Sequence, residues 1–504
     1  MKTRLFSILT ATALTLFMAA CANSDDMAQK DDKQKGGTET TTDGLTAFVV
    51  EDNTATTRTT ASHDGSGLNF YWTEGDRLWV KNDAESPALK QDARSDIADK
   101  LTASTIPGGV QRADKAKFWF DGTYTNSTYP VRYTGKNSTS GDKVTIKAEQ
   151  IQPAPNDASH LGESGDCGTA VATKVGGRYH FTLDHKAAYL TLMPYNSPQQ
   201  INTLLTQIKV TADKAICGEF DFDDSGINLS SRPTPTPANQ SITLKLKDAD
   251  PHQGFAAIPQ ALTPATNAAT IVLAPGTYST LTVEYTFHNI CNKDITISKT
   301  YNDVVLTAGK NKSVKADLNI PAFRYPTDYI FGDNPATNYY PNMNEISWYT
   351  MHGDIHWDDS KLFTVNGILY QGGAWIKKLS VIAADHSKPV SALVATACNG
   401  VSYSIYNYKG FGQYVRFDGP APIMGEPANT NDYFFIYALG QNGHYASIGE
   451  LIELFSSTGN HLNSYNPYPS GSIDHRYMLV ISKAYVASLN ADIEYYINKW
   501  PDER

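Results

Sequence analysis

Several motifs that catalysis or nucleic-acid binding requires are missing from the sequence. The formal net charge is −10 and no basic stripe runs along the chain, which argues against a nucleic-acid partner. There is no G-x-S-x-G elbow, H-E-x-x-H pair or Walker loop, and Gly410-Phe411-Gly412 lacks the third glycine of a dinucleotide site. We therefore expect a protein that is not an enzyme and that carries no cofactor.

Cysteine is scarce, with five residues in 504. Cys21 follows an apolar leader, and the other four have no C-x-x-C spacing that would indicate zinc binding or thiol exchange. An oxidising compartment outside the cytoplasm would permit disulfides between them, but the spacing of the cysteines leaves the pairing open. These four residues are Cys167, Cys217, Cys291 and Cys398.

The apolar run at the N-terminus is too short for a permanent transmembrane helix. It covers the 16 uncharged residues from Leu5 to Ala20, whereas a bilayer core needs about 20. Lys2 and Arg4 precede the run and Cys21 follows it, so residues 1–20 are typical of a signal peptide with a lipobox. We expect cleavage before Cys21 and acylation of its thiol, which would anchor the chain to a membrane. The alternative is a plain secretory peptide in which Cys21 is incidental.

Residues 21–44 are polar and contain no aromatic side chain, so they cannot bury enough surface to offset the entropy of ordering. We interpret them as a disordered, acidic tether. The pair Asp25-Asp26 resembles the surface-export signal of Bacteroidota lipoproteins. This resemblance implies a lipid anchor in the outer membrane and display on the cell surface.

The sequence is rich in strand-forming residues. Short segments of Thr, Val, Tyr and Ile alternate with Gly, Asn, Asp and Pro, which predicts a mainly β protein built from β-sandwiches. Apolar spacing indicates helices between Pro87 and Leu101 and between Val486 and Trp500. The predicted strands include Leu45–Val50, Phe70–Trp72, Leu78–Val80, Lys143–Ile146, Tyr189–Leu192, Thr282–Tyr285 and Val304–Leu306.

Two linkers divide the predicted strands into three domains. Pro153 to Gly168 and Pro321 to Pro341 are rich in Pro, Asn, Ser, Gly or Tyr and lack periodicity. We therefore place β-sandwich domains at 45–165 and 166–322, and an α+β domain at 323–504. The proline-rich run from Arg232 to Pro237 is expected to be a loop within the second domain.

The first two domains resemble the fimbrillin family, the pilins of type V fimbriae. The segment Thr57-Arg58-Thr59-Thr60, followed by Trp72 to Val80, is similar to the opening of that family. The resemblance implies tandem β-sandwiches with Greek-key, transthyretin-like topology. Further similar segments follow in order at Phe181–Leu190, Cys217–Phe220, Ala257–Gln260 and Leu306–Lys310.

The third domain resembles the C-terminal module of large, tip-type fimbrillins, chiefly at Asn344–Tyr349 and Gly372–Lys378. This implies a tip or accessory adhesin that contacts a host or bacterial surface ligand. The segment Asp432–Gly440 is also similar to a lectin-like or formylglycine-enzyme-like module. That module usually has Trp-Ser-Ser, where this chain has Phe455-Ser456-Ser457.

The family resemblance also implies a mechanism of assembly. A lipoprotein precursor is cut after an arginine early in the first domain, which removes a strand, and a strand from another fimbrial subunit replaces it. In this chain Leu45–Val50 is the strand and Arg58 is the expected processing site. The alternative is that Arg58 is a turn residue that is never cut, so that the chain remains a surface lipoprotein binding glycans or host ligands.

Two groups of side chains could bind a ligand in the third domain. An extended backbone would place His352, Asp354, His356 and Asp358 on one face, where they could hold zinc or another divalent ion. The alternative is a solvated polar face. Trp348, Trp357 and Trp375 could stack on a sugar or a partner protein, although tryptophans also fill small β domains as core residues.

Overall fold

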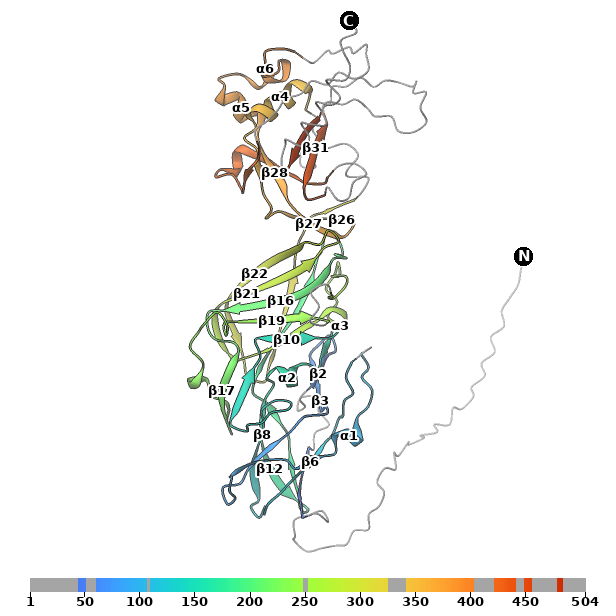
Figure 1. Ribbon diagram of the computed structural model, residues 1–504, viewed down its shortest axis with the longest axis vertical. Coiled ribbons are helices and arrows are strands. Elements are labelled where there is room, and N and C mark those ends of the chain that lie inside the picture. The colour runs from blue at the N-terminus through green and yellow to red at the C-terminus, as the bar shows by residue number, and fades with distance from the viewer. Residues whose placement is uncertain are drawn as a thin grey trace, which may run out of the picture.

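The computed structural model describes residues 44–50, 60–106, 109–247, 253–324, 341–402, 421–440, 448–455 and 478–483. The protein is mainly β, as predicted, and its three regions follow one another along the long axis of the molecule (Figure 1). None of the helices in these ranges is long and apolar enough to cross a membrane. The predicted signal peptide, the tether with Cys21, the Arg58 segment and the helix at 486–500 lie outside the described residues.

The first region is one large sheet with an aromatic inner face. Residues at alternate positions point inward and are buried, among them Phe48, Phe118 and Phe120, and Trp72 packs against them. This is the period of two that a strand imposes on its side chains. The strand order is β5 (Leu89–Gln91), β4 (Trp79–Lys81), β8 (Thr128–Tyr133), β12 (Gly168–Val175), β13 (Arg178–Phe181), β1 (Thr46–Val50), β7 (Lys117–Phe120) and β6 (Arg94–Ser95), with β14 (Asp184–His185) also paired to β12.

The helix predicted between Pro87 and Leu101 is largely wrong. Most of that segment forms β5 and β6, and only the single turn α1 (Ile97–Lys100) is helical. The reason is tertiary, because β5 pairs with β4 and β6 pairs with β7, and these ladders outweigh local helix propensity.

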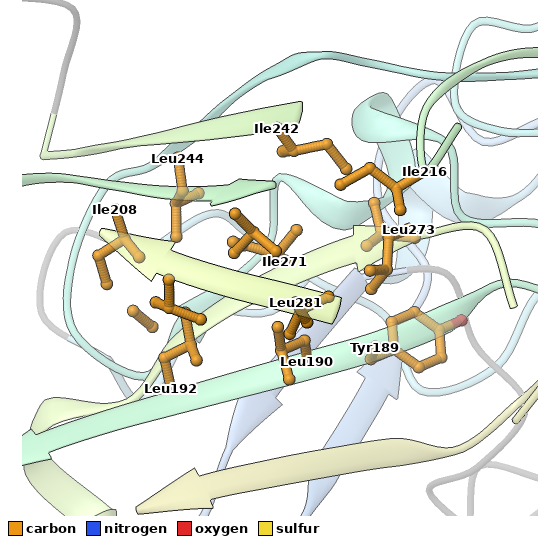
Figure 2. Packing of buried hydrophobic residues seen from close by; sticks show 14 of the residues in the cluster. Tyr189, Leu190, Leu192, Ile208, Ile216, Ile242, Leu244, Ile271, Leu273 and Leu281 are labelled. Atoms are coloured by element: carbon orange, nitrogen blue, oxygen red, sulfur yellow. The ribbon is translucent and has the colours of Figure 1, made fainter. Parts of the chain in front are cut away.

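The second region is a sandwich of two sheets. A five-stranded sheet in the order β10-β19-β16-β21-β22 lies against a three-stranded sheet in the order β20-β15-β23. Figure 2 shows Leu190 and Leu192 of β15 packed with Ile271 of β20 and Leu244 of β19 between the sheets. The strands are β10 (Glu149–Gln152), β15 (Ala188–Tyr195), β16 (Leu204–Ala212), β19 (Ser241–Leu246), β20 (Ala269–Leu273), β21 (Gly276–His288), β22 (Asp294–Leu306) and β23 (Asn311–Asp317).

Strand pairing crosses the domain boundary that we predicted at residue 165. β12 and β13 follow that boundary in the chain but pair with β8 and β1 of the first sheet. β9 (Lys143–Ile146) and β10 precede it but pair with β17 (Gly218–Asp223) and β19. The first two regions therefore share strands. The remaining short elements here are β11 (Asp157–Ala158), α2 (Leu161–Ser164), β18 (Gly226–Ile227), η1 (Leu229–Ser231) and α3 (Pro264–Asn267).

A small sheet anchors the start of the second region. The hairpin of β2 (Thr60–His63) and β3 (Leu68–Tyr71) pairs with β11. Ala61 and Phe70 of this hairpin are buried in the same core as Leu190. The hairpin of β2 and β3 is therefore held in the second core, whereas β1 belongs to the first sheet.

Two glutamines close one edge of the sandwich. Gln150 donates to the Val272 carbonyl over 2.7 Å and accepts from the Val272 N–H over 3.1 Å. Gln152 likewise donates to the Ala268 carbonyl over 2.9 Å and accepts from the Thr270 N–H over 2.8 Å. The side-chain amides thus take the place of a neighbouring strand along the edge of β20, which would otherwise bury unpaired backbone groups.

Replacing Gln150 with leucine should lower the free energy of unfolding by about 2–6 kcal/mol, because the buried Val272 N–H and C=O each lose a partner at about 1–3 kcal/mol per group. Urea denaturation measures the loss, and hydrogen exchange at the Val272 amide localises it. Gln207→Leu is the control, since that side chain makes only a 3.5 Å contact with Thr286. Equal effects of the two changes would show that the edge does not need the amide.

The third region is α+β and is fixed to the second. Leu369 donates its N–H to the Thr203 hydroxyl over 2.8 Å, and Asn202 donates its N–H to the Gly367 carbonyl over 2.8 Å. The elements are β24 (Ala322–Phe323), α4 (Met343–His352), β25 (His356–Trp357), β26 (Leu362–Val365), β27 (Ile368–Gln371), β28 (Gly373–Lys377), α5 (Leu379–Asp385), α6 (Val390–Ala395), β29 (Ile423–Met424), η2 (Thr430–Asp432), β30 (Tyr433–Tyr437), β31 (Leu451–Phe455) and β32 (Met478–Ser482).

Candidate functional site

The first strand lies in the interior of the first sheet, paired on both sides. Phe48 of β1 is in register with Tyr179 of the parallel strand β13 and with Phe118 of the antiparallel strand β7. Because β1 is parallel to one neighbour and antiparallel to the other, β13 and β7 run in opposite directions. Any strand placed between them would be parallel to one and antiparallel to the other, whichever way it entered. Backbone pairing therefore does not select a direction, and side chains must set the register.

A box of aromatic rings surrounds the Phe48 side chain, which is fully buried. Its ring stacks on Tyr179 with centroids 4.7 Å apart, and the edges of Phe120 and Tyr124 approach at 5.0 and 5.3 Å. Tyr129 completes the box at 6.5 Å. Such offset and edge-to-face contacts add to the burial of apolar area. The groove is therefore shaped for one aromatic side chain at this position.

Hydrogen bonds hold the tyrosines of the box in place. The Tyr179 hydroxyl donates to the Asn126 carbonyl over 2.7 Å, and the Tyr129 hydroxyl accepts from the N–H groups of Thr125 and Asn126. Burial raises the pKa of Tyr179 to about 12, so the hydroxyl stays neutral at physiological pH. The walls of the groove are thus fixed from outside β1.

The predicted metal ligands of the third region are not on one strand, and the assumption of an extended backbone was wrong. His352 is the last residue of α4, and Asp354 has a positive φ of 41°. A capping box explains the helix: Asn342 accepts from the Glu345 N–H, and the Glu345 carboxylate accepts from the Asn342 N–H. Only His356 belongs to β25.

The two aspartates of that prediction have other partners. Asp358 accepts from the Trp375 indole N–H over 3.0 Å, and Asp354 accepts from the Tyr433 hydroxyl over 2.6 Å. His356 lies 3.8 Å from Asp354. Over the described ranges, no three or more His, Cys, Asp or Glu side chains gather where they could hold a metal ion.

The structure separates the three candidate tryptophans. Trp348 and Trp357 are buried, and their indole N–H groups donate to the Thr396 carbonyl and the Asp359 carboxylate. Both are core residues, which was the alternative interpretation. Trp375 is partly exposed on β28, with the Lys361 ammonium 5.1 Å from its ring centre. Contact between Trp375 and a ligand remains a prediction.

The four cysteines outside the leader are free thiols. Cys167 and Cys217 are buried, and burial raises the pKa of Cys217 to about 11. The disulfides that export would permit are therefore not formed between these four residues in the structure.

A buried polar cluster that no sequence motif indicated joins the first two regions. His185 Nδ1 lies 3.0 Å from an Asp166 carboxylate oxygen, and the Tyr189 hydroxyl donates to the same oxygen. Burial, then the Asp166 charge, raises the pKa of Tyr189 well above its usual value. Asp166 precedes β12, His185 ends β14 and Tyr189 lies in β15, so only the fold brings the three together.

No protein-family model and no curated protein matches this chain. Among solved structures it is similar to a candidate cell adhesion protein of Bacteroides ovatus, at 14% identity over 55% of this chain and 93% of that one, with a TM-score of 0.31. A candidate cell adhesion protein of Bacteroides uniformis gives 14% identity, coverage of 55% and 94%, and a TM-score of 0.29. A fimbrial protein of Bacteroides ovatus gives 11% identity, coverage of 54% and 48%, and a TM-score of 0.23.

Proposed function

We propose that this protein is a surface-displayed fimbrial subunit of tip or accessory adhesin type, in which a strand from another subunit replaces β1. The observation that carries the proposal is the position of β1. It fills an interior groove between β13 and β7, yet the chain that follows it is anchored in a different sheet through β2 and β3. A cut between Val50 and Thr60 would therefore free β1 without detaching the rest of the chain.

In this proposal, cleavage after Arg58 separates β1, and with it the acylated Cys21, from the remainder of the protein. The uncut chain stays in the outer membrane through its lipid, and the cut chain enters the fimbrium. Loss of β1 leaves the facing edges of β13 and β7 without backbone partners and empties the aromatic box. An incoming strand restores the ladders on both sides, which is the general basis of strand addition.

The pairing of β1 also supports a second function. Because β1 is paired on both sides, the first sheet of the uncut chain is already complete. An uncut lipoprotein that binds glycans or other surface ligands through its third region needs no exchange. The N-terminal residue of the protein purified from cells separates the two functions, since cleavage after Arg58 exposes Thr59.

A chain with a site-specific protease sequence inserted between residues 51 and 59 tests replacement directly. After cleavage and mild denaturant treatment to release β1, a labelled peptide of residues 44–50 should bind the cut chain and not the uncut one. Fluorescence anisotropy measures the binding. The same peptide with Phe48→Ala is the matched control and should bind far more weakly. Failure of the unmodified peptide to bind the refolded, cut chain would leave only the uncut lipoprotein.

A further inference from the structure

Two histidines that are far apart in the sequence meet in the third region. His352 is the last residue of α4, and His386 caps the C-terminal end of α5. Their ring centres are 4.3 Å apart, with an angle of 71° between the ring planes. Trp348, one helical turn before His352, contacts both rings with centroids 5.2 and 5.1 Å away. The fold thus places His352 beside His386, whereas an extended strand would have placed it beside Asp354 and His356.

Both imidazoles are available to a ligand. His386 is exposed and His352 is partly exposed. Among the described residues, no hydrogen bond or ion pair to either ring is present, and both rings contact each other and Trp348. Partial burial, and then the nearby His386, lower the pKa of His352, which favours the neutral imidazole that binds metals.

The position of the pair also suits a cation. Each histidine stands at the C-terminal end of a helix, where the carbonyl groups give a partial negative charge. Two imidazoles that hold one ion at a metal–nitrogen distance of about 2.1 Å and an angle near 90° have ring centres roughly 4–5 Å apart. The observed separation falls in this range, and a tetrahedral angle would hold the rings further apart.

We propose that His352 and His386 form a binding site for a divalent late transition-metal ion, Cu²⁺ or Ni²⁺. An angle near 90° between ligands is that of square-planar or octahedral coordination, which these ions adopt, and Cu²⁺ has the highest affinity in the divalent series. No third protein ligand gathers here within the described residues, so water completes the coordination. A closed structural zinc site needs four protein ligands and does not fit.

Titration of the tag-free, full-length protein with CuCl₂ and NiCl₂ tests the site. Calorimetry should show a site with one ion per chain, and Trp348 fluorescence should fall as it fills and recover when EDTA is added. The chain has seven tryptophans, so Trp348→Phe identifies the signal of this one. Loss of even an outer-shell partner typically weakens metal binding by roughly 10–100-fold, so His352→Ala and His386→Ala should each weaken it by at least about tenfold.

His356→Ala is the matched control, because that histidine belongs to the same region but lies on β25 beside Tyr433. It should leave the affinity unchanged. His386 is exposed, so its replacement should not alter the near-ultraviolet circular dichroism or the melting temperature, and His352→Gln provides a second variant if alanine perturbs α4. Equal affinity in the parent, His352 and His386 variants would overturn the proposal, as would loss of the site in His356→Ala alone.

Discussion

Replacing Phe48 with alanine is expected to destabilise the first sheet by about 3–5 kcal/mol, the range for removing a fully buried phenylalanine. The four surrounding aromatic rings are held from outside β1, so they cannot collapse fully into the space. Hydrogen exchange at the amides of β13 and β7 measures the effect, because these strands pair directly with β1.

Val49→Ala is the control on the same strand, since Val49 points to the other face and is only partly buried. It should cost much less than Phe48→Ala. Phe48→Leu should be intermediate, because it keeps much of the apolar volume but loses the ring contacts. If the amides of β13 and β7 exchange no faster in Phe48→Ala than in Val49→Ala, the aromatic box does not hold β1 in place. A replacement strand would then not need an aromatic residue at this position.

Asn156→Ala should lower the free energy of unfolding of the second region by about 4 kcal/mol or more. The Asn156 side chain donates to the carbonyls of His63 and Pro264 and accepts from the Ala268 N–H, and leaving buried groups such as these unpaired costs about 1–3 kcal/mol each. Its φ is +67°, which costs an alanine roughly 1–2 kcal/mol. Urea denaturation measures the loss, and hydrogen exchange at the Ala61 amide localises it.

Asn156→Gly separates the two causes, because glycine adopts a positive φ without strain but restores none of the hydrogen bonds. We expect it to recover only the part of the loss that comes from the backbone. Asn156 also bears on the proposed function, since it ties His63 of β2 to Ala268 beside β20. A loss in Asn156→Ala no larger than that in an exposed asparagine such as Asn302 would refute this role.

The mainly β class and the strands themselves could be predicted from local sequence. β1, β9 and β15 could be predicted because each is a short run of β-branched, aromatic or apolar residues, a signal that depends only on local composition. The helix predicted at 87–101 failed because pairing with β4 and β7 decided its conformation. The composition of residues 153–168 likewise predicted a linker. It could not reveal that strands after the linker pair with the first sheet and strands before it pair with strands of the second region.

The amino-acid sequence by itself determined that the protein is mainly β and that Leu45–Val50 is a strand, and the capping box of Asn342 and Glu345 is a local signal for the start of α4. Only the tertiary structure decided that β1 lies between β13 and β7, that Phe48 enters a box of four rings, and that His352 meets His386 instead of Asp354. The physical reason is the distance along the chain over which each interaction acts. Residue composition and helix capping depend on a few neighbouring residues. Strand pairing and side-chain contacts join residues that are far apart in the sequence, and sequence separation does not predict which of them meet.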